Sequence, residues 1–157
     1  MNNKNLLYLN LALDDEDVSL GFANTWIKQF SNKFENVDII TLNKSNENIG
    51  TNNKVNIYGL LKGDNTSRIS KFLLIRKTIK KLTSTTSYDL CFSHMSPLLL
   101  LMTKFYRLKK FPTILWYTHS KPKEFSKKII LLMSLLFCDK VVTASNSSFP
   151  YKSNKLN

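Results

Sequence analysis

Short apolar runs alternate with segments of helical periodicity along the whole chain, and this alternation restricts its fold more than any other feature. The runs predict strands and the periodic segments predict amphipathic helices. Strands that alternate with helices form a mostly parallel sheet with helices on both faces, so we expect a three-layer α/β sandwich of about six strands. The expected strands are 5–11, 37–42, 55–60, 88–93, 112–118 and 140–144, and the expected helices are 20–33, 69–82, 97–109 and 123–137, with a short last helix after 145–148.

Polar residues follow the strand expected at 112–118, at the edge where parallel sheets bind ligands. Thr118 ends that strand, and His119 and Ser120 come next. Because an imidazole both donates and accepts hydrogen bonds, His119 is the candidate for contact with substrate phosphates or hydroxyls. The alternative is a histidine that is bonded to a neighbouring backbone carbonyl.

Two further loops fall on the same predicted edge. His94 and Ser96 lie between a strand and a helix that begins at Pro97, where free backbone N–H groups favour an anion. The alternative there is a capped helix start with a locally bonded histidine. The loop 12–21 is acidic and lacks the glycine pattern of a dinucleotide-binding loop. It is either a loop that contacts a ligand, in which Gly21 permits a close approach to the backbone, or a solvated turn before the first helix. Two carboxylates, Asp89 and Asp139, precede strands and belong to the opposite edge.

The net charge of +12 is unusual for a chain of 157 residues. It indicates an anionic partner, either a nucleic acid, an acidic membrane surface or a phosphorylated substrate; the alternative is a compositional bias toward Asn, Lys and Ile. The basic side chains gather on the expected helices. These helices either rest on an anionic bilayer or simply present solvated, charged faces. Aromatic residues do not interleave with them as in proteins that stack single-stranded nucleic acid, so nucleic acid is the less favoured partner.

The cysteine pattern and the lack of a signal-peptide pattern predict a cytoplasmic protein. Cys91 and Cys138 lie in or beside apolar runs and form no CxxC pair, which favours two reduced, buried thiols. The histidines and cysteines have no zinc spacing, so we expect no metal site. The N-terminus has no signal-peptide pattern, and the apolar run 129–138 is too short to cross a bilayer. Peripheral contact with the inner face of a membrane stays open.

Four segments together resemble family 4 glycosyltransferases, in the family's order. They are LGFANTWI at 20–27, FSHMSP at 92–97, LWYTH at 115–119 and DKVVTAS at 139–145. The resemblance implies the GT-B fold, in which two Rossmann-like domains face across a cleft. It also implies transfer of a sugar from a nucleotide-sugar donor to a glycan or glycolipid acceptor, with retention of configuration and without a metal or other cofactor. By the same resemblance His119 lies at the reacting centre, and the acceptor side is lined by Gly21, His94, Ser96, Thr118 and Ser120.

One departure from the family bears on activity. The sequence stops where family members continue into the domain that holds the nucleotide-sugar, so residues 1–157 are expected to form a single acceptor-binding domain. Transfer needs the donor diphosphate neutralised beside the acceptor, so we expect little activity without a donor-domain polypeptide. Two other interpretations stay open: a non-catalytic basic α/β module for an anionic membrane or nucleic acid, and an unrelated flavodoxin-like nucleotide-binding domain.

Overall fold

Strands and helices alternate in the computed structural model as the sequence pattern predicts. The structure describes residues 4–13, 22–44, 53–61, 67–106, 111–118, 122–144 and 149–156. In chain order the elements are β1 (Asn5–Leu13), α1 (Phe22–Lys33), β2 (Asn36–Lys44), β3 (Val55–Leu61), α2 (Arg68–Thr85), β4 (Leu90–His94), α3 (Pro97–Tyr106), β5 (Thr113–Trp116), α4 (Phe125–Phe137) and β6 (Lys140–Val142).

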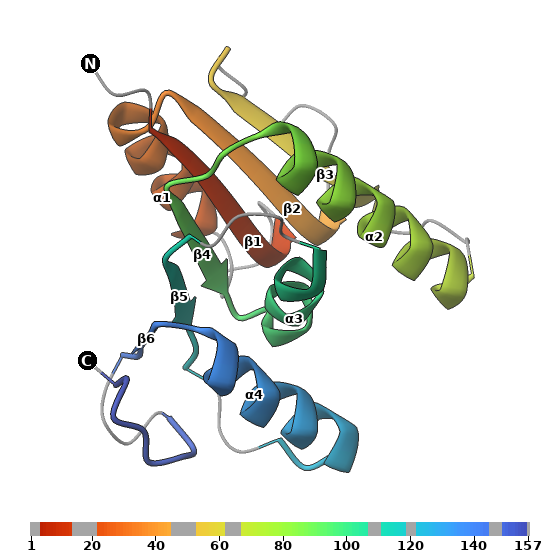
Figure 1. Ribbon diagram of the computed structural model, residues 1–157, viewed down its shortest axis with the longest axis vertical. Helices are drawn as coiled ribbons and strands as arrows, with labels where there is room; N and C mark the ends of the chain where they lie inside the picture. The colour runs from red at the N-terminus through yellow and green to blue at the C-terminus, as the bar shows by residue number, and fades with distance from the viewer. Residues whose placement is uncertain are drawn as a thin grey trace.

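The six strands form one sheet in the order β3-β2-β1-β4-β5-β6, and every neighbouring pair is parallel. The chain runs outward from β1 to β3 on one side and then returns to build β4, β5 and β6 on the other side (Figure 1). The order therefore reverses between β1 and β4. In sheets of this kind ligands bind outside the carboxyl ends of the strands at that reversal.

Helices cover both faces of the sheet, as expected for a three-layer sandwich. Helix α1 lies behind the sheet in Figure 1, and α2, α3 and α4 lie in front. Alternate residues of each strand point to opposite faces. Leu6 and Tyr8 of β1 accordingly pack with Ile27 of α1, whereas Leu7 and Leu9 join the cluster under the other three helices.

Side chains at the element ends fix where strands and helices begin. The Oγ atom of Ser67 accepts a hydrogen bond from the backbone N–H of Ser70 at 3.2 Å, which caps the start of α2. Asp89 accepts from the backbone N–H of Asn5, and Asp139 accepts from that of Thr113, each at 2.8 Å. Both carboxylates therefore lie at the amino ends of strands, as predicted.

The apolar face predicted for α2 is only half buried. Ile75, Ile79 and Leu82 are buried, but Ile69 is 74% exposed and Phe72 is 47% exposed. The first half of α2 projects past the edge of the sheet, so its apolar side chains have no strands beneath them (Figure 1). The sequence showed the periodicity of the helix but not where the sheet ends.

The short last helix was a wrong prediction for the described residues 149–156. This segment instead returns beside β6, where Val141 and Leu156 form a parallel bridge. Lys155 anchors it, because its Nζ atom donates to the carbonyl oxygens of Leu135 and Cys138 at 2.8 and 2.6 Å. These are carbonyls at the end of α4, where a cation is favoured by the helix dipole.

Candidate functional site

Asn10 and His94 are cross-strand neighbours at the carboxyl ends of β1 and β4, where the strand order reverses. The distance between Asn10 Oδ1 and His94 Nδ1 is 2.8 Å, and Asn10 Nδ2 donates to the carbonyl oxygen of Ala12 at 2.8 Å. Since the amide oxygen can only accept, the Nδ1 atom of His94 carries the proton and donates it. The pair therefore fixes one tautomer of the imidazole at the reversal point.

These two side chains belong to a row that crosses the sheet. In register, Thr41 of β2 pairs with Asn10, and His94 pairs with Trp116 of β5. Thr41, Asn10 and His94 are all fully buried. Asn10 and Thr41 were not among the site residues predicted from the sequence. Their signal was a polar residue inside an apolar strand, because a buried polar side chain is costly unless it is hydrogen-bonded.

Two tryptophans lie against the same end of the row. The ring centroid of Trp26 from α1 is 5.2 Å from that of His94 and 5.0 Å from that of Trp116, and both contacts are edge-on. Both indole rings are half-buried. They give this edge of the sheet an aromatic wall that is partly open to solvent, and such rings can stack on the apolar face of a ligand.

The turn between β4 and α3 is conformationally unusual. Met95 has a φ of 54°, which places a non-glycine residue in the left-handed region. This conformation costs roughly 1 to 3 kcal/mol and is concentrated at functional sites. The turn is held by hydrogen bonds from Met95 N to the Trp116 carbonyl oxygen at 2.9 Å, and from Ser96 Oγ to the His94 carbonyl oxygen at 3.0 Å.

Thr118 is tied to this turn through the methionine sulfur. Its backbone N–H donates to Met95 Sδ at 3.4 Å, and its hydroxyl lies 3.7 Å from the same atom. Thr118 itself is half-buried, while the preceding Tyr117 is buried, and burial raises the pKa of its phenol. The strained turn therefore sets where the chain leaves β5.

The structure brings three of the six predicted site residues to one edge. His94, Ser96 and Thr118 all lie at the carboxyl ends of β4 and β5. His94 and Ser96 are buried at this edge, with exposed fractions of 0% and 2%, so neither faces solvent as an acceptor-lining residue would. The ring of Trp26 packs against that of His94. Gly21, His119 and Ser120 lie outside the described residues.

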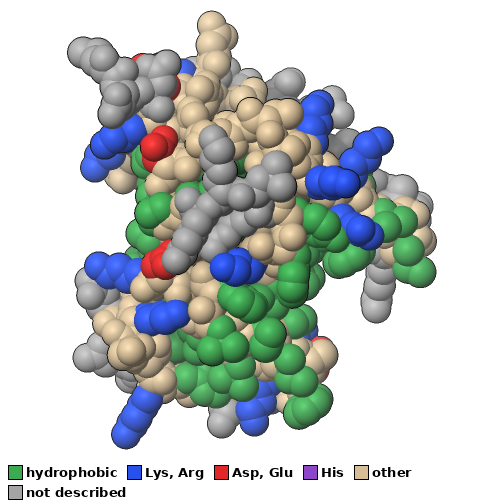
Figure 2. Space-filling model, in the orientation of Figure 1, with side chains coloured by type: hydrophobic (Ala, Val, Ile, Leu, Met, Phe, Trp, Pro, Cys, Tyr) green, Lys and Arg blue, Asp and Glu red, His purple; other side chains and the backbone are tan. Residues whose placement is uncertain are grey.

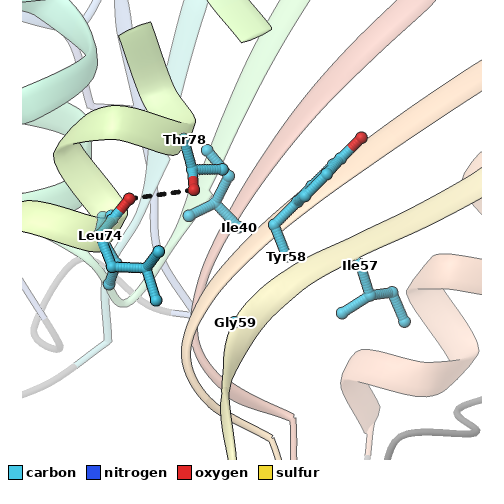
Figure 3. A pocket seen from close by; sticks show the side chains of 7 residues that line it. Ile40, Ile57, Tyr58, Gly59, Leu74 and Thr78 are labelled. Atoms are coloured by element: carbon cyan, nitrogen blue, oxygen red, sulfur yellow. Dashed lines mark hydrogen bonds between the residues drawn. The ribbon is translucent and has the colours of Figure 1, made fainter. Parts of the chain in front are cut away.

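A separate groove lies between α2 and the β2–β3 side of the sheet, with a volume of about 240 Å³ (Figure 3). Ile40 and Tyr58 line it from the sheet, and Leu74 and Thr78 line it from α2, with the Thr78 hydroxyl bonded to the Leu74 carbonyl oxygen at 3.0 Å. No charged side chain is among its lining residues in the described part of the chain. The groove therefore lacks the groups that would bind a phosphate.

Asp38 is buried on the same face as this groove and serves the core. Its carboxylate accepts from the Tyr88 hydroxyl at 2.6 Å and from Asn56 Nδ2 at 3.0 Å. Burial, followed by this bond to Asp38, raises the pKa of Tyr88. The hydrogen bonds of this carboxylate thus link β2 to β3 and to the segment just before β4.

The described residues include neither a candidate metal centre nor a candidate membrane span. That part of the chain contains no group of three or more His, Cys, Asp or Glu side chains placed to hold a metal ion. Cys91 and Cys138 are both buried and are not joined in a disulfide, as the sequence predicted. None of the described helices combines the length and the apolar character that crossing a membrane requires.

Comparisons with known proteins identify the family. The sequence model of the family described as "Glycosyl transferase 4-like" matches residues 12–145, which is more than half of the chain. Comparison with curated proteins found no match to the sequence.

Three solved structures illustrate the likeness of fold. The apo form of the lipopolysaccharide outer core galactosyltransferase WaaB aligns with 98% of this chain at 12% identity and a TM-score of 0.63. The sucrose-phosphate synthase of Thermosynechococcus elongatus also aligns with 98% of the chain, at 14% identity and a TM-score of 0.64. A UDP-N-acetylglucosamine 2-epimerase aligns with the same share at 8% identity and a TM-score of 0.57.

The alignments cover only part of each solved protein. This chain spans 44% of the galactosyltransferase and 47% of each of the other two. Because an epimerase shares the fold with a galactosyltransferase, the fold alone does not select the reaction. The family match does not depend on fold likeness, and it establishes that this chain belongs to the glycosyl transferase 4-like family.

Proposed function

We propose that the chain is the acceptor-binding half of a retaining glycosyltransferase that uses a nucleotide-sugar as donor. The observation that carries the proposal is the position of Asn10 and His94 at the reversal of strand order, in a chain that matches this family. Ligands of doubly wound sheets bind at that place. The half-buried rings of Trp26 and Trp116 add a surface on which a sugar can stack.

The proposed roles follow from burial. Asn10, His94 and Ser96 are enclosed, so they would shape the edge of the sheet without touching the acceptor in this conformation. Thr118 is half-buried at the end of the fifth strand, and it would reach the acceptor together with Ser120 and Gly21. His119 directly follows Thr118 in the sequence and is proposed as the residue at the reacting centre.

Transfer would need a second domain. The donor diphosphate must be neutralised close to the acceptor oxygen, and the chain spans less than half of the transferases that it resembles. We therefore expect residues 1–157 alone to bind a glycan acceptor, to bind nucleotide-sugars weakly and to transfer little. Neither a metal nor another cofactor is expected in the reaction, and the protein would act on the cytoplasmic side of the membrane.

The test combines acceptor binding with complementation. The purified chain is screened against a glycan array and titrated with a panel of UDP- and GDP-sugars, and transfer is then measured after a donor domain from the family is added. We expect glycan binding by the chain alone, and transfer only in the mixture. Tight binding of nucleotide-sugars together with no glycan binding would place the chain on the donor side and refute the proposal.

Two variants separate the site from the scaffold. Thr118→Val removes a hydroxyl from the proposed acceptor edge and should weaken glycan binding by about tenfold, the usual value of one hydrogen bond to a ligand. His119→Ala should reduce transfer in the complemented mixture by at least that factor. The matched control is Thr85→Val, an exposed hydroxyl at the end of α2, which should leave both measurements unchanged.

A second candidate function is a non-catalytic basic module that binds an anionic surface. The observation that favours it is the net charge of +12. Such a module would bind anionic vesicles equally well with and without the His119→Ala substitution, and it would bind no glycan. This outcome separates it from the acceptor-binding proposal.

A further inference from the structure

Helix α4 exposes the wrong kind of side chain for a helix that faces water. Phe125, Ile129, Leu132, Met133 and Leu136 are all solvent-exposed, from 36% for Met133 to 75% for Phe125. Their spacing of i, i+4, i+7, i+8 and i+11 places them on one side of the helix. The outward face of α4 is therefore a continuous apolar stripe.

A different face of α4 packs against the core. Leu131 and Ser134 are the buried residues of the helix, and Ser134 satisfies its hydroxyl within the helix by donating to the Leu131 carbonyl oxygen at 2.7 Å. The sheet is thus covered by the narrower face of α4. The wider apolar face of α4 is exposed.

Neighbouring helices on the same side of the sheet extend the apolar surface. Phe105 of α3 is 70% exposed, and Ile69, Phe72 and Leu73 near the start of α2 are exposed as well. Figure 2 shows these green side chains gathered over the part of the molecule where Figure 1 places α3 and α4, with a second group at the projecting end of α2. Isolated exposed apolar residues are ordinary, but a contiguous group is a feature of interaction sites.

The helices that carry this surface are basic. Helices α2, α3 and α4 contain six, one and two Lys or Arg residues, and none of the three contains an Asp or Glu. Glu124, just before α4, is paired with Lys127 at 2.6 Å. The apolar surface is accordingly bordered by blue side chains in Figure 2.

Charge and length together select the partner. A second copy of the same surface would bring nine cations against nine, so self-association is disfavoured. An anionic bilayer offers both an apolar interior and negative headgroups. With 13 residues, α4 is about 20 Å long, which is shorter than the roughly 30 Å hydrocarbon core, so it can lie in the interface but not span it.

We propose that α4, with the exposed ends of α2 and α3, forms a membrane-docking surface that lies in the headgroup region of an anionic bilayer. The inference rests on this exposed face and its charge, and it holds whether or not the chain takes part in glycosyl transfer. Phe125 begins α4 seven residues after Thr118 in the sequence. Docking would hold the chain at a membrane surface that also carries lipid-linked molecules.

The test is flotation of the 157-residue chain with vesicles of phosphatidylcholine, with and without about 30 mol% phosphatidylglycerol. We expect binding to the anionic vesicles only, and weaker binding as salt rises from about 0.1 to about 0.5 M, because screening shortens the reach of the charges. Failure to bind anionic vesicles at the lower salt concentration would overturn the proposal, as would concentration-dependent dimers that hide the surface.

Matched variants locate the surface. Phe125→Ser with Leu136→Ser should weaken vesicle binding by tenfold or more, about the effect of withdrawing apolar side chains from a bilayer. Lys127→Gln with Lys128→Gln should weaken it on the order of tenfold. The control, Lys28→Gln with Lys33→Gln on α1, makes the same change of charge on the opposite face of the sheet.

The control pair should bind like the unmodified chain. Equal losses for the α1 and α4 lysine pairs would show that binding follows net charge alone and would refute an oriented surface. All of these positions are exposed or half-exposed on helices, so unfolding midpoints of the variants should stay close to that of the unmodified chain. None of them touches the proposed acceptor edge, so glycan binding in solution should be unchanged, which separates this test from that of the acceptor proposal.

Discussion

Removal of the Tyr8 hydroxyl should stabilise the protein, contrary to the usual effect of trimming a buried side chain. Tyr8 is fully buried under α1, and its hydroxyl has no hydrogen-bond partner among the described residues. Its ring packs edge-on against Phe30 with centroids 5.5 Å apart, and a phenylalanine keeps that contact. A buried polar group without a partner costs about 1 to 3 kcal/mol, so Tyr8→Phe should raise the free energy of unfolding by about 1 kcal/mol.

Tyr88→Phe is the matched comparison. The Tyr88 hydroxyl donates to buried Asp38 at 2.6 Å, and a hydrogen bond to a charged group contributes about 1.5 to 3 kcal/mol. This variant should lower the free energy of unfolding by that amount. Because the two tyrosines lie in separate clusters on opposite faces of the sheet, the double variant should give the sum of the two effects.

The assay is urea unfolding at neutral pH, followed by circular dichroism. For a domain of this size, 1 kcal/mol corresponds to a shift of about 2 to 4 °C in Tm, so thermal unfolding gives a second measure. A Tyr8→Phe variant that loses as much stability as Tyr88→Phe would show that the Tyr8 hydroxyl is bonded. That result would refute the assignment of an unsatisfied polar group to the core under α1.

Three further predictions concern pH, a close approach and the last segment. Burial raises the pKa of Tyr8 and Tyr88 above the ordinary 10.0, so these phenols lose their protons in the unfolded chain before they do so in the folded protein. The free energy of unfolding should therefore be full below pH 10.0 and fall as pH rises above it. Urea unfolding midpoints should show this fall, and it should be smaller in Tyr8→Phe. Gly59→Ala should cost about 1 to 3 kcal/mol, because its Cβ would lie 2.4 Å from Thr41 Cγ2 and 3.0 Å from its carbonyl oxygen; unchanged urea unfolding would exclude the clash. Lys155→Met should lower the free energy of unfolding by about 1 to 2 kcal/mol, because two carbonyl oxygens at the end of α4 lose their hydrogen-bond donor. Residues 149–156 should then be cleaved faster by proteases, and an unchanged cleavage rate would contradict this.

Much of the fold could be predicted because each element depends on local pattern. The alternation of apolar runs and helical periodicity placed all ten described elements within a few residues of their observed bounds. Pro97 begins α3 as predicted, since proline at the first helical position loses no needed hydrogen bond. The carboxylates before β4 and β6 likewise occupy the amino edge that their place in the sequence indicated.

The candidate site could be predicted only in outline. That His94 and Thr118 end neighbouring strands followed from the pattern of the chain. The bond between Asn10 and His94 did not, because it joins residues 84 positions apart that meet only once β1 and β4 pair. The burial of His94 involves Trp26, which reaches it from α1, the helix between β1 and β2 in the sequence and 68 positions away.

The sequence by itself determined the strands, the helices and the parallel sheet, because those depend on residue propensity and on periods of two and 3.6 residues. Only the tertiary structure decided which side of each helix meets the sheet. Helix α4 is apolar on both sides, so its periodicity did not distinguish the face that covers β5 and β6 from the face that is exposed. The pairing of strands settled this, since it sets how much sheet lies beneath each helix and leaves the remaining apolar surface to solvent or to a partner.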